Sequence, residues 1–241
     1  MILRQLFDFK SCTYTYLVGS TKSNTALLID PVKGNTDQYI GLLAELGLEL
    51  KIALDTHVHA DHITALGKLK ELTSCTTMIA KESQLNCDSA PQRISDKQVI
   101  ALGELELNAI YTPGHTDDSY SFHLQTDCKN YLFSGDTLLI RATGRTDFQN
   151  GSADRLYDSL FNKLLLLDKE TIVLPGHDYK GWTRSTIGEE IAHNSRLQKT
   201  DKRDFITMMG NLDLPKPRHI DIAVPANQQC GKTHNIHATN L

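Results

Sequence analysis

Four strand-like segments of this chain each end in residues that can bind a metal ion. The densest group is Thr-His-Val-His-Ala-Asp-His at residues 56–62, which places three imidazoles and one carboxylate within six residues. His115, Asp136 and His177 each follow an apolar run and a glycine, in Pro-Gly-His, Ser-Gly-Asp and Pro-Gly-His. A fold that joins these residues in one site must bring four strand ends together at the rim of its sheets.

The hydrophobic pattern predicts how strands and helices alternate. The first thirty residues alternate apolar and polar positions, which indicates two or three strands. Further strands are expected at 51–55, 76–80, 97–101, 105–111, 119–125, 130–134 and 171–174, and helices at 36–46, 63–72, 152–167, 183–194 and 201–209. This mixture predicts one α/β domain of layered sheets covered by helices, with an irregular tail at about 211–241.

Composition and charge narrow the classes of function. A hydrophobic fraction of 40% and a charged fraction of 22% are typical of a globular protein. No apolar run approaches the roughly 20 residues of a membrane span, and the first residues resemble neither a secretory signal nor a transit peptide. A net charge of −4 without a basic stripe argues against nucleic acid as a partner. We therefore expect a cytoplasmic protein with no nucleic-acid or membrane partner.

The cysteines do not form a recognisable framework. They are odd in number, lie far apart and include no C-x-x-C pair, at positions Cys12, Cys75, Cys87, Cys128 and Cys230. A disulfide framework is unusual in a chain of this length. We expect five reduced thiols.

The residue types of the cluster favour a hard or borderline divalent metal. Imidazole nitrogen and carboxylate oxygen bind Zn, Fe and Mn, and the set contains no thiolate. His57 and His59 are two residues apart, so in an extended segment their rings can point to one position. The candidates, His57, His59, Asp61, His62, His115, Asp136 and His177, could hold two ions bridged by Asp136, or one ion with the other groups around it.

The other histidines are expected outside this site. His123 shares the polar face of its strand with Ser121 and Gln125, which predicts exposure to solvent. The same interpretation, as structural or solvated residues, applies to His193, His219, His234 and His237.

The motif H-x-H-x-D-H at 57–62, followed in order by His115, Asp136 and His177, resembles the metallo-β-lactamase superfamily. The resemblance implies an αββα sandwich with the metal at its edge, a fold that serves several kinds of enzyme. Longer segments, at 139–149, 175–179, 209–217 and 222–227, are similar to the persulfide dioxygenases. That second resemblance implies oxidation of glutathione persulfide by O2 to sulfite and glutathione.

The resemblance also implies a metal and its ligands. One Fe(II) per chain would be held by His57, His115 and Asp136, which leaves open positions for small ligands. Zinc is the alternative, or adventitious, metal. The remaining candidates would surround the ligands, orient them and transfer protons without binding the iron; they are His59, Asp61, His62 and His177.

Three substrate contacts follow from the same resemblance. Arg145 would bind a glutathione carboxylate through its guanidinium group, although a surface pair with Asp147 is the alternative. Tyr179 and Cys230 match positions near the family's site. A homodimer is left open.

The chain departs from the family pattern at three positions. Asp118 and Ser119 stand where relatives usually carry Gly and Cys, and Gly176 replaces a usual Ala. We expect these changes to alter the pocket without touching the ligands.

Two other functions are compatible with the motif. Glyoxalase II, a hydroxyacylglutathione hydrolase, shares the motif but uses two metals on a thioester. It has a longer helical carboxyl-terminal region, whereas 64 residues follow His177 here. A non-catalytic persulfide-sensing or sulfur-carrier module with a structural metal is the alternative outside enzymes, and it is disfavoured because structural sites are normally closed by four ligands.

Overall fold

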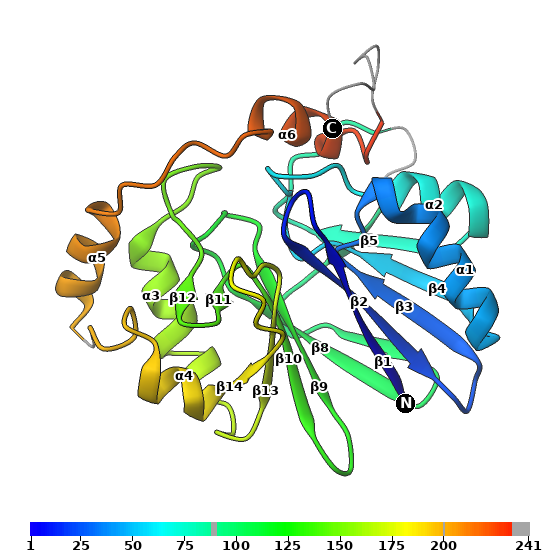
Figure 1. Cartoon of the computed structure of the whole chain (residues 1–241), viewed down its shortest axis with the longest axis horizontal. Coiled ribbons are helices and arrows are strands. Elements are labelled where there is room, and N and C mark those ends of the chain that lie inside the picture. Colours follow the sequence, from blue (N-terminus) through cyan, green and yellow to red (C-terminus); the bar gives the residue numbers. More distant parts are fainter. Residues whose placement is uncertain (88–90, 200, 233–241) are drawn as a thin grey trace.

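Two six-stranded sheets lie face to face in the computed structural model, which describes residues 1–87, 91–199 and 201–232 (Figure 1). The first sheet has the order β1 (Ile2–Asp8), β2 (Thr13–Ser20), β3 (Thr25–Ile29), β4 (Glu49–Leu54), β5 (Thr76–Ala80) and β6 (Gln92–Ile94). The second has the order β14 (Ser185–Thr186), β13 (Ile172–Pro175), β10 (Asn130–Gly135), β9 (Tyr120–Gln125), β8 (Leu105–Tyr111) and β7 (Val99–Leu102). A small hairpin of β11 (Leu138–Leu139) and β12 (Ala142–Thr143) follows β10.

The inner faces of the two sheets form the central core. Along β9, Tyr120, Phe122 and Leu124 alternate with polar residues and are almost completely buried. The ring centroids of Tyr16 in β2 and Phe133 in β10 lie 5.1 Å apart, which joins the two sheets. Burial of each large apolar side chain stabilises the fold by about 1.5–3 kcal/mol. The period of two residues therefore sets which face of each strand turns inward.

Helices cover the outer face of each sheet. On the first sheet lie α1 (Thr36–Leu46), which follows the short helix η1 (Lys33–Asn35), and α2 (Leu66–Thr73). On the second lie α3 (Ala153–Phe161), η2 (Leu164–Leu166), α4 (Ile187–His193) and α5 (Lys202–Gly210). Figure 1 shows these groups on the right and left of the sheets. The predicted αββα sandwich is confirmed.

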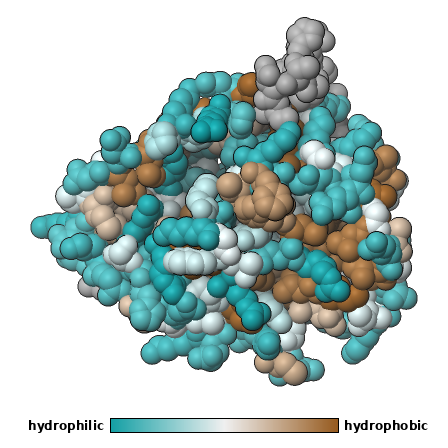
Figure 2. Space-filling model, in the orientation of Figure 1, coloured by the Kyte–Doolittle hydropathy of each residue, from teal (hydrophilic) through white to brown (hydrophobic). Residues whose placement is uncertain are grey.

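The outer surface is largely hydrophilic on the face seen in Figure 2, with hydrophobic surface gathered where β2, β3 and α1 lie in Figure 1. Ile2, Leu6, Leu42 and Leu46 are partly buried and pack on the cluster between the first sheet and its helices. Among the described residues, no helix is both long and apolar enough to span a membrane.

The predicted strands are present, and so are the predicted helices at 36–46, 63–72 and 201–209, with small shifts of their bounds. The helix expected at 152–167 is instead α3 followed by η2, and the helix expected at 183–194 is limited to α4, which begins after β14. The structure adds β6, β11, β12, β14 and α6 (Ile220–Gln228). The last of these corrects the expectation of an irregular tail at 211–241. Ala223, Ala226 and Asn227 are buried on one side of α6, whereas Pro225 inside the helix obscures the helical pattern. Residues 233–241 of the expected tail lie outside the described residues.

The predicted exposure of His123 is wrong, because its side chain is buried. It lies in β9 directly opposite Leu132 of β10, and Leu132 belongs to the cluster that packs against the helices of this side. A polar face in the middle of a sheet is therefore covered here by helices, not by water. His193 is exposed and His219 is half-buried, while His234 and His237 lie outside the described residues.

The expectation of five reduced thiols is wrong for two of them. Cys87 and Cys230 form a disulfide across a sequence separation of 143 residues. Cys12, Cys75 and Cys128 are free. The sequence provides no local signal for the pair, because only the fold brings the end of α6 beside the loop after β5.

We predict that the protein purified without reductant and denatured presents three thiols to iodoacetamide, and five after reduction, because disulfide sulfurs are not nucleophilic thiolates. Mass spectrometry counts the added groups. The variant Cys87→Ser should present four without reduction, since Cys230 loses its partner. Five modified thiols in the unreduced wild type would contradict the pairing.

Candidate metal centre

The candidate ligands lie where strand ends meet. β8, β10 and β13 run in one direction, because β9 is antiparallel to β8 and β10 and β13 is parallel to β10. Their carboxyl ends therefore lie at the same edge, and His115, Asp136 and His177 follow these three ends. The loop after β4 brings residues 57–62 to this edge from the other sheet.

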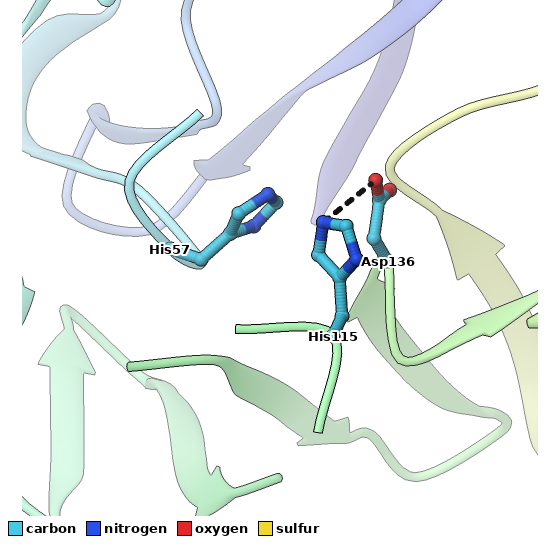
Figure 3. A group of neighbouring side chains, drawn as sticks. All are labelled: His57, His115 and Asp136. Carbon is cyan, nitrogen blue, oxygen red and sulfur yellow. Dashed lines mark ion pairs between the residues drawn. The ribbon is translucent and has the colours of Figure 1, made fainter. Parts of the chain in front are cut away.

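Three of these side chains form one compact group. Single ligand atoms of His57, His115 and Asp136 all lie within 4.8 Å of one another. Nε2 of His115 is 3.5 Å from Oδ2 of Asp136, and the ring centroids of the two histidines are 4.9 Å apart. Figure 3 shows the three side chains reaching into one space from different loops. Two imidazoles and a carboxylate at this spacing can share one metal ion.

Hydrogen bonds at Nδ1 set the tautomer of both imidazoles. Nδ1 of His115 lies 2.8 Å from the carbonyl of Arg145, which can only accept, so this nitrogen carries the proton. Thr56 Oγ1 donates to Asp30 Oδ2 at 3.0 Å and thus accepts from Nδ1 of His57 at 2.9 Å. Both rings therefore keep Nε2 as the lone-pair nitrogen, as a metal ligand requires.

The charge states of His57 and Asp136 also fit a cation. Burial lowers the pKa of His57 well below its ordinary value, and the neighbouring His59 and His115 lower it further, so this ring is neutral. Burial alone would raise the pKa of Asp136, but His177 outweighs burial and lowers it. Neutral imidazole and ionised carboxylate are the forms that bind metals.

Glycine allows two of the sharp backbone turns between a strand and the candidate ligand that follows it. Gly114 and Gly135 adopt φ values of 147° and 50°, which favour glycine. A Cβ at Gly135 would also lie 2.8 Å from Oγ1 of Thr56, the hydroxyl that orients His57. Close backbone approach at this position therefore lets the two sheets meet at the site.

His177 lies between two carboxylates. Its Nδ1 is 2.7 Å from Oδ1 of Asp136, and its Nε2 is 2.9 Å from Oδ2 of Asp61. Burial alone would lower the pKa of His177, but these two carboxylates outweigh it and raise the pKa well above the ordinary value. A doubly protonated ring has no lone pair for a metal. In this arrangement, His177 holds Asp136 in place.

A second group of His59, Asp61 and His62 could by its spacing hold another ion. His62 Nδ1 is 2.9 Å from Asp61 Oδ2, and His59 Nε2 is 3.1 Å from Asp30 Oδ1. Burial acts to lower the pKa of His59, yet Asp30 raises it to about 9, so the ring is positively charged at neutral pH. Nδ1 of His59 and Nε2 of His62 are nevertheless buried without a hydrogen-bond partner among the described residues. That one ion rather than two binds here stays a prediction.

The sequence analysis missed Asp30, which orients the site from the first sheet. Its carboxylate is buried and accepts from the backbone N–H of Thr56 at 2.6 Å as well as from the Thr56 hydroxyl and His59. Asp30 directly follows β3. The available signal was the one used for Asp136: an acidic residue at the end of an apolar strand.

Asp118, one of the departures from the family pattern, is buried and links three loops. Oδ2 accepts from the backbone N–H of Val58 at 3.1 Å and from Ser83 Oγ at 2.5 Å, and Oδ1 accepts from Thr116 Oγ1 at 2.6 Å. Ser119 Oγ lies 2.7 Å from the same Thr116 hydroxyl. These two residues therefore connect the loop of His57 to the loop of His115.

Gly176, the third departure from the family pattern, lies beside Asp136, one of the candidate ligands. A Cβ at Gly176 would lie 2.7 Å from Oδ1 of Asp136. The absence of a side chain at 176 thus leaves room beside this carboxylate.

Comparison with known proteins places the chain in a family. The model of the metallo-beta-lactamase superfamily matches residues 12–177. Persulfide dioxygenase ETHE1, mitochondrial, from Mus musculus is 45% identical, over 96% of this chain and 89% of the mouse protein; the Homo sapiens protein is 44% identical with the same coverage. The chain is a member of the persulfide dioxygenase family within this superfamily. The crystal structure of ETHE1 from Myxococcus xanthus superposes with a TM-score of 0.91 at 48% identity, covering 96% of this chain and all of that one.

Two of the substrate contacts implied by the persulfide dioxygenase resemblance lie near the centre. The Tyr179 ring is 73% exposed and stacks on His177, with ring centroids 6.1 Å apart and an interplanar angle of 8°. Arg145 supplies the carbonyl that orients His115. Cys230 is buried in the disulfide with Cys87. Contact of all three residues with substrate stays a prediction.

The guanidinium group of Arg145 is already paired. Nε and Nη2 donate to the two carboxylate oxygens of Asp147 at 2.7 and 2.8 Å, which is the pair named as the alternative. Nη1 and Nη2 also donate to the carbonyls of Pro215 and Leu214 at 2.7 and 3.1 Å. Arg145 therefore ties the segment before α6 to the loop of His115.

We predict that His177 of the metal-free protein titrates well above the pKa of about 6.5 of an ordinary histidine, so that it keeps a proton on each ring nitrogen where an ordinary histidine is already neutral. The carboxylates of Asp136 and Asp61 stabilise the charged ring. Nitrogen chemical shifts of the imidazole in an NMR titration measure this directly. The variant Asp61→Asn should lower the pKa, and titration of the wild-type ring at or below about 6.5 would refute the assignment.

Proposed function

We propose that this chain is a persulfide dioxygenase that oxidises glutathione persulfide with O2 to sulfite and glutathione, using one Fe(II) per chain. The observation that carries the function is similarity to the mouse enzyme over 96% of this chain and 89% of that protein. Similarity of this extent includes the segments outside the superfamily match at 12–177.

We propose His57, His115 and Asp136 as the iron ligands. Their Nε2 atoms and carboxylate fit the two-histidine, one-carboxylate set of non-haem iron oxygenases, and bound ferrous iron would supply the redox chemistry by which O2 reacts with sulfur. Zinc fits the same donors as an alternative or adventitious metal.

The residues around the ligands would hold charge and move protons. His177 keeps a proton on each ring nitrogen and shares them with Asp136 and Asp61. Asp61 also accepts from Thr13 Oγ1 at 2.9 Å, and its side chain is 27% exposed. Asp61 is thus the group through which a proton on Nε2 of His177 can exchange with solvent.

Substrate contacts are proposed at the exposed side of this network. The Tyr179 ring lies over the His177 ring and offers an apolar face to the glutathione portion. A glutathione carboxylate that binds Arg145 must replace Asp147 at the guanidinium group, which presents two parallel N–H donors. Cys230 would have to be released from Cys87 to offer a thiol.

A cytoplasmic location and a homodimer remain proposals. The names of the mouse and human relatives describe those proteins as mitochondrial.

The function is tested with anaerobically prepared protein. We expect one iron per chain by metal analysis and by anomalous scattering at the iron edge, together with O2 uptake on addition of glutathione persulfide. Thioester hydrolysis is measured in parallel on a glutathione thioester. The variant Asp136→Ala should lose both iron and uptake, whereas Asp127→Ala, an exposed residue in the turn before β10, should retain them. Two zinc ions with thioester cleavage and no O2 uptake would refute the proposal.

We predict that Arg145→Ala raises the Michaelis constant for glutathione persulfide by about 10- to 100-fold with little change in kcat, because a charge-assisted hydrogen bond to substrate is lost. Steady-state O2 uptake measures both constants. Arg155→Ala, which removes a guanidinium group bound to Tyr111, is the control and should leave both unchanged. A fall in kcat at constant Michaelis constant would contradict this, and would mean that Arg145 acts by holding the carbonyls of Pro215 and Leu214 and not by binding substrate.

A further inference from the structure

The carboxyl-terminal helix α6 packs on the loop of residues 57–62, which carries the proposed ligand His57. This helix lies outside the segment matched by the superfamily model, residues 12–177. In Figure 1 it lies at the upper edge of the molecule, above the loops at the ends of the strands. An element beyond the matched segment therefore contributes to the surroundings of the site.

Asn227 of α6 makes the contact. Its Nδ2 donates to the carbonyls of His59 and His62 at 2.9 and 2.8 Å, and its Oδ1 accepts from the N–H of Thr64 at 2.9 Å. The side chain is 3% exposed. Both amide hydrogens and the amide oxygen are thus used on the backbone of one loop, and an isosteric carboxylate could supply only the acceptor.

The loop needs such a partner. Residues 57–62 belong to no helix or strand, so their backbone groups have no ladder to bind them. On the other side of the loop, Val58 is held through its N–H by Asp118 and through its carbonyl by Gln149 Nε2 at 2.6 Å. Asn227 supplies the contacts at His59 and His62.

The end of α6 is itself anchored. The Gln228 carbonyl accepts from the N–H of Asn86 at 2.8 Å, and Lys33 Nζ donates to the carbonyl of Gly231 at 2.7 Å. The disulfide between Cys87 and Cys230 lies in the same segment. The amide of Asn227 is therefore presented from a fixed position.

We propose that Asn227 is a positioning residue that fixes the backbone of residues 59–64 and, through it, the directions of His57 and Asp61. It touches none of the three proposed ligands. The inference rests on the metal-binding part of the proposed function and does not depend on which substrate is oxidised.

The test compares Asn227→Ala and the isosteric Asn227→Asp with the wild type, all as full-length chains. Fe(II) affinity is measured anaerobically by chelator competition. We expect both variants to bind iron about 10- to 100-fold more weakly, the range found when groups behind metal ligands are removed. In O2 uptake with reconstituted protein, we expect kcat to fall while the Michaelis constant for the persulfide stays unchanged.

Asn194→Ala is the matched control for lost stability. Asn194 is also fully buried and donates to a backbone carbonyl, that of Ala142 at 2.9 Å, and to Glu190 at 2.9 Å. We expect this variant to unfold at a lower temperature yet to bind iron within about twofold of the wild type. Equal loss of iron affinity in Asn194→Ala and Asn227→Ala would reduce Asn227 to a general contribution to stability and overturn the proposal.

Hydrogen exchange of the metal-free proteins gives a readout independent of iron and of activity. The Thr64 amide should be protected in the wild type and exchange faster in Asn227→Asp, with the change confined to the peptide that covers residues 56–64. An unprotected Thr64 amide in the wild type would overturn the proposal even where a variant does not fold. Failure of the wild type to bind iron would refute the proposed function instead, whereas wild-type iron affinity in both Asn227 variants would refute this inference alone.

Discussion

Two carboxylates at the edge of the sheets, the buried Asp30 and the largely buried Asp136, constrain the rest of the site. An ionised carboxylate removed from water is tolerated only where cations or N–H and O–H donors surround it. Asp136 has His177, and Asp30 has His59 together with the N–H and hydroxyl of Thr56. Removal of one partner from such a pair costs about 3–5 kcal/mol. The same contacts that neutralise these charges therefore also fix the directions of the proposed metal ligands.

The hydrogen bonds and charge pairs of the site divide its histidines into two groups. His57 and His115 are bound at Nδ1 by groups that leave Nε2 free. His177 is instead bound by carboxylates at both ring nitrogens, and His59 is paired with Asp30. Identical imidazoles thus have either an available Nε2 or a positive charge, according to their neighbours. A single ion with open positions is what the proposed function requires, because the enzyme must bind both O2 and a persulfide.

The buried strands of the sandwich hold the ends of the loops in place, and the loops carry the candidate ligands. Each proposed ligand follows a strand that is anchored by buried apolar residues, among them Leu54 of β4, Leu107 of β8 and Phe133 of β10. The loops are then tied to one another by side chains from distant parts of the chain, among them Asp118 and Gln149 at Val58 and Arg145 at the segment before α6. The candidate metal centre is therefore assembled from both sheets and from helix α6.

The sequence by itself determined the order of the main strands and helices, because hydrophobic periodicity is local. It also determined which side chains are able to bind a metal, because that ability belongs to the residue type. Only the tertiary structure decided which of them lie within 4.8 Å of one another, and it revealed Asp30 and Asn227, whose partners are remote in sequence. Only the tertiary structure likewise decided the pairing of Cys87 with Cys230 and the burial of His123. A contact between distant segments, or a helix layer that covers a strand, does not change the local hydrophobic pattern of the sequence. These features could therefore be found only in the tertiary structure.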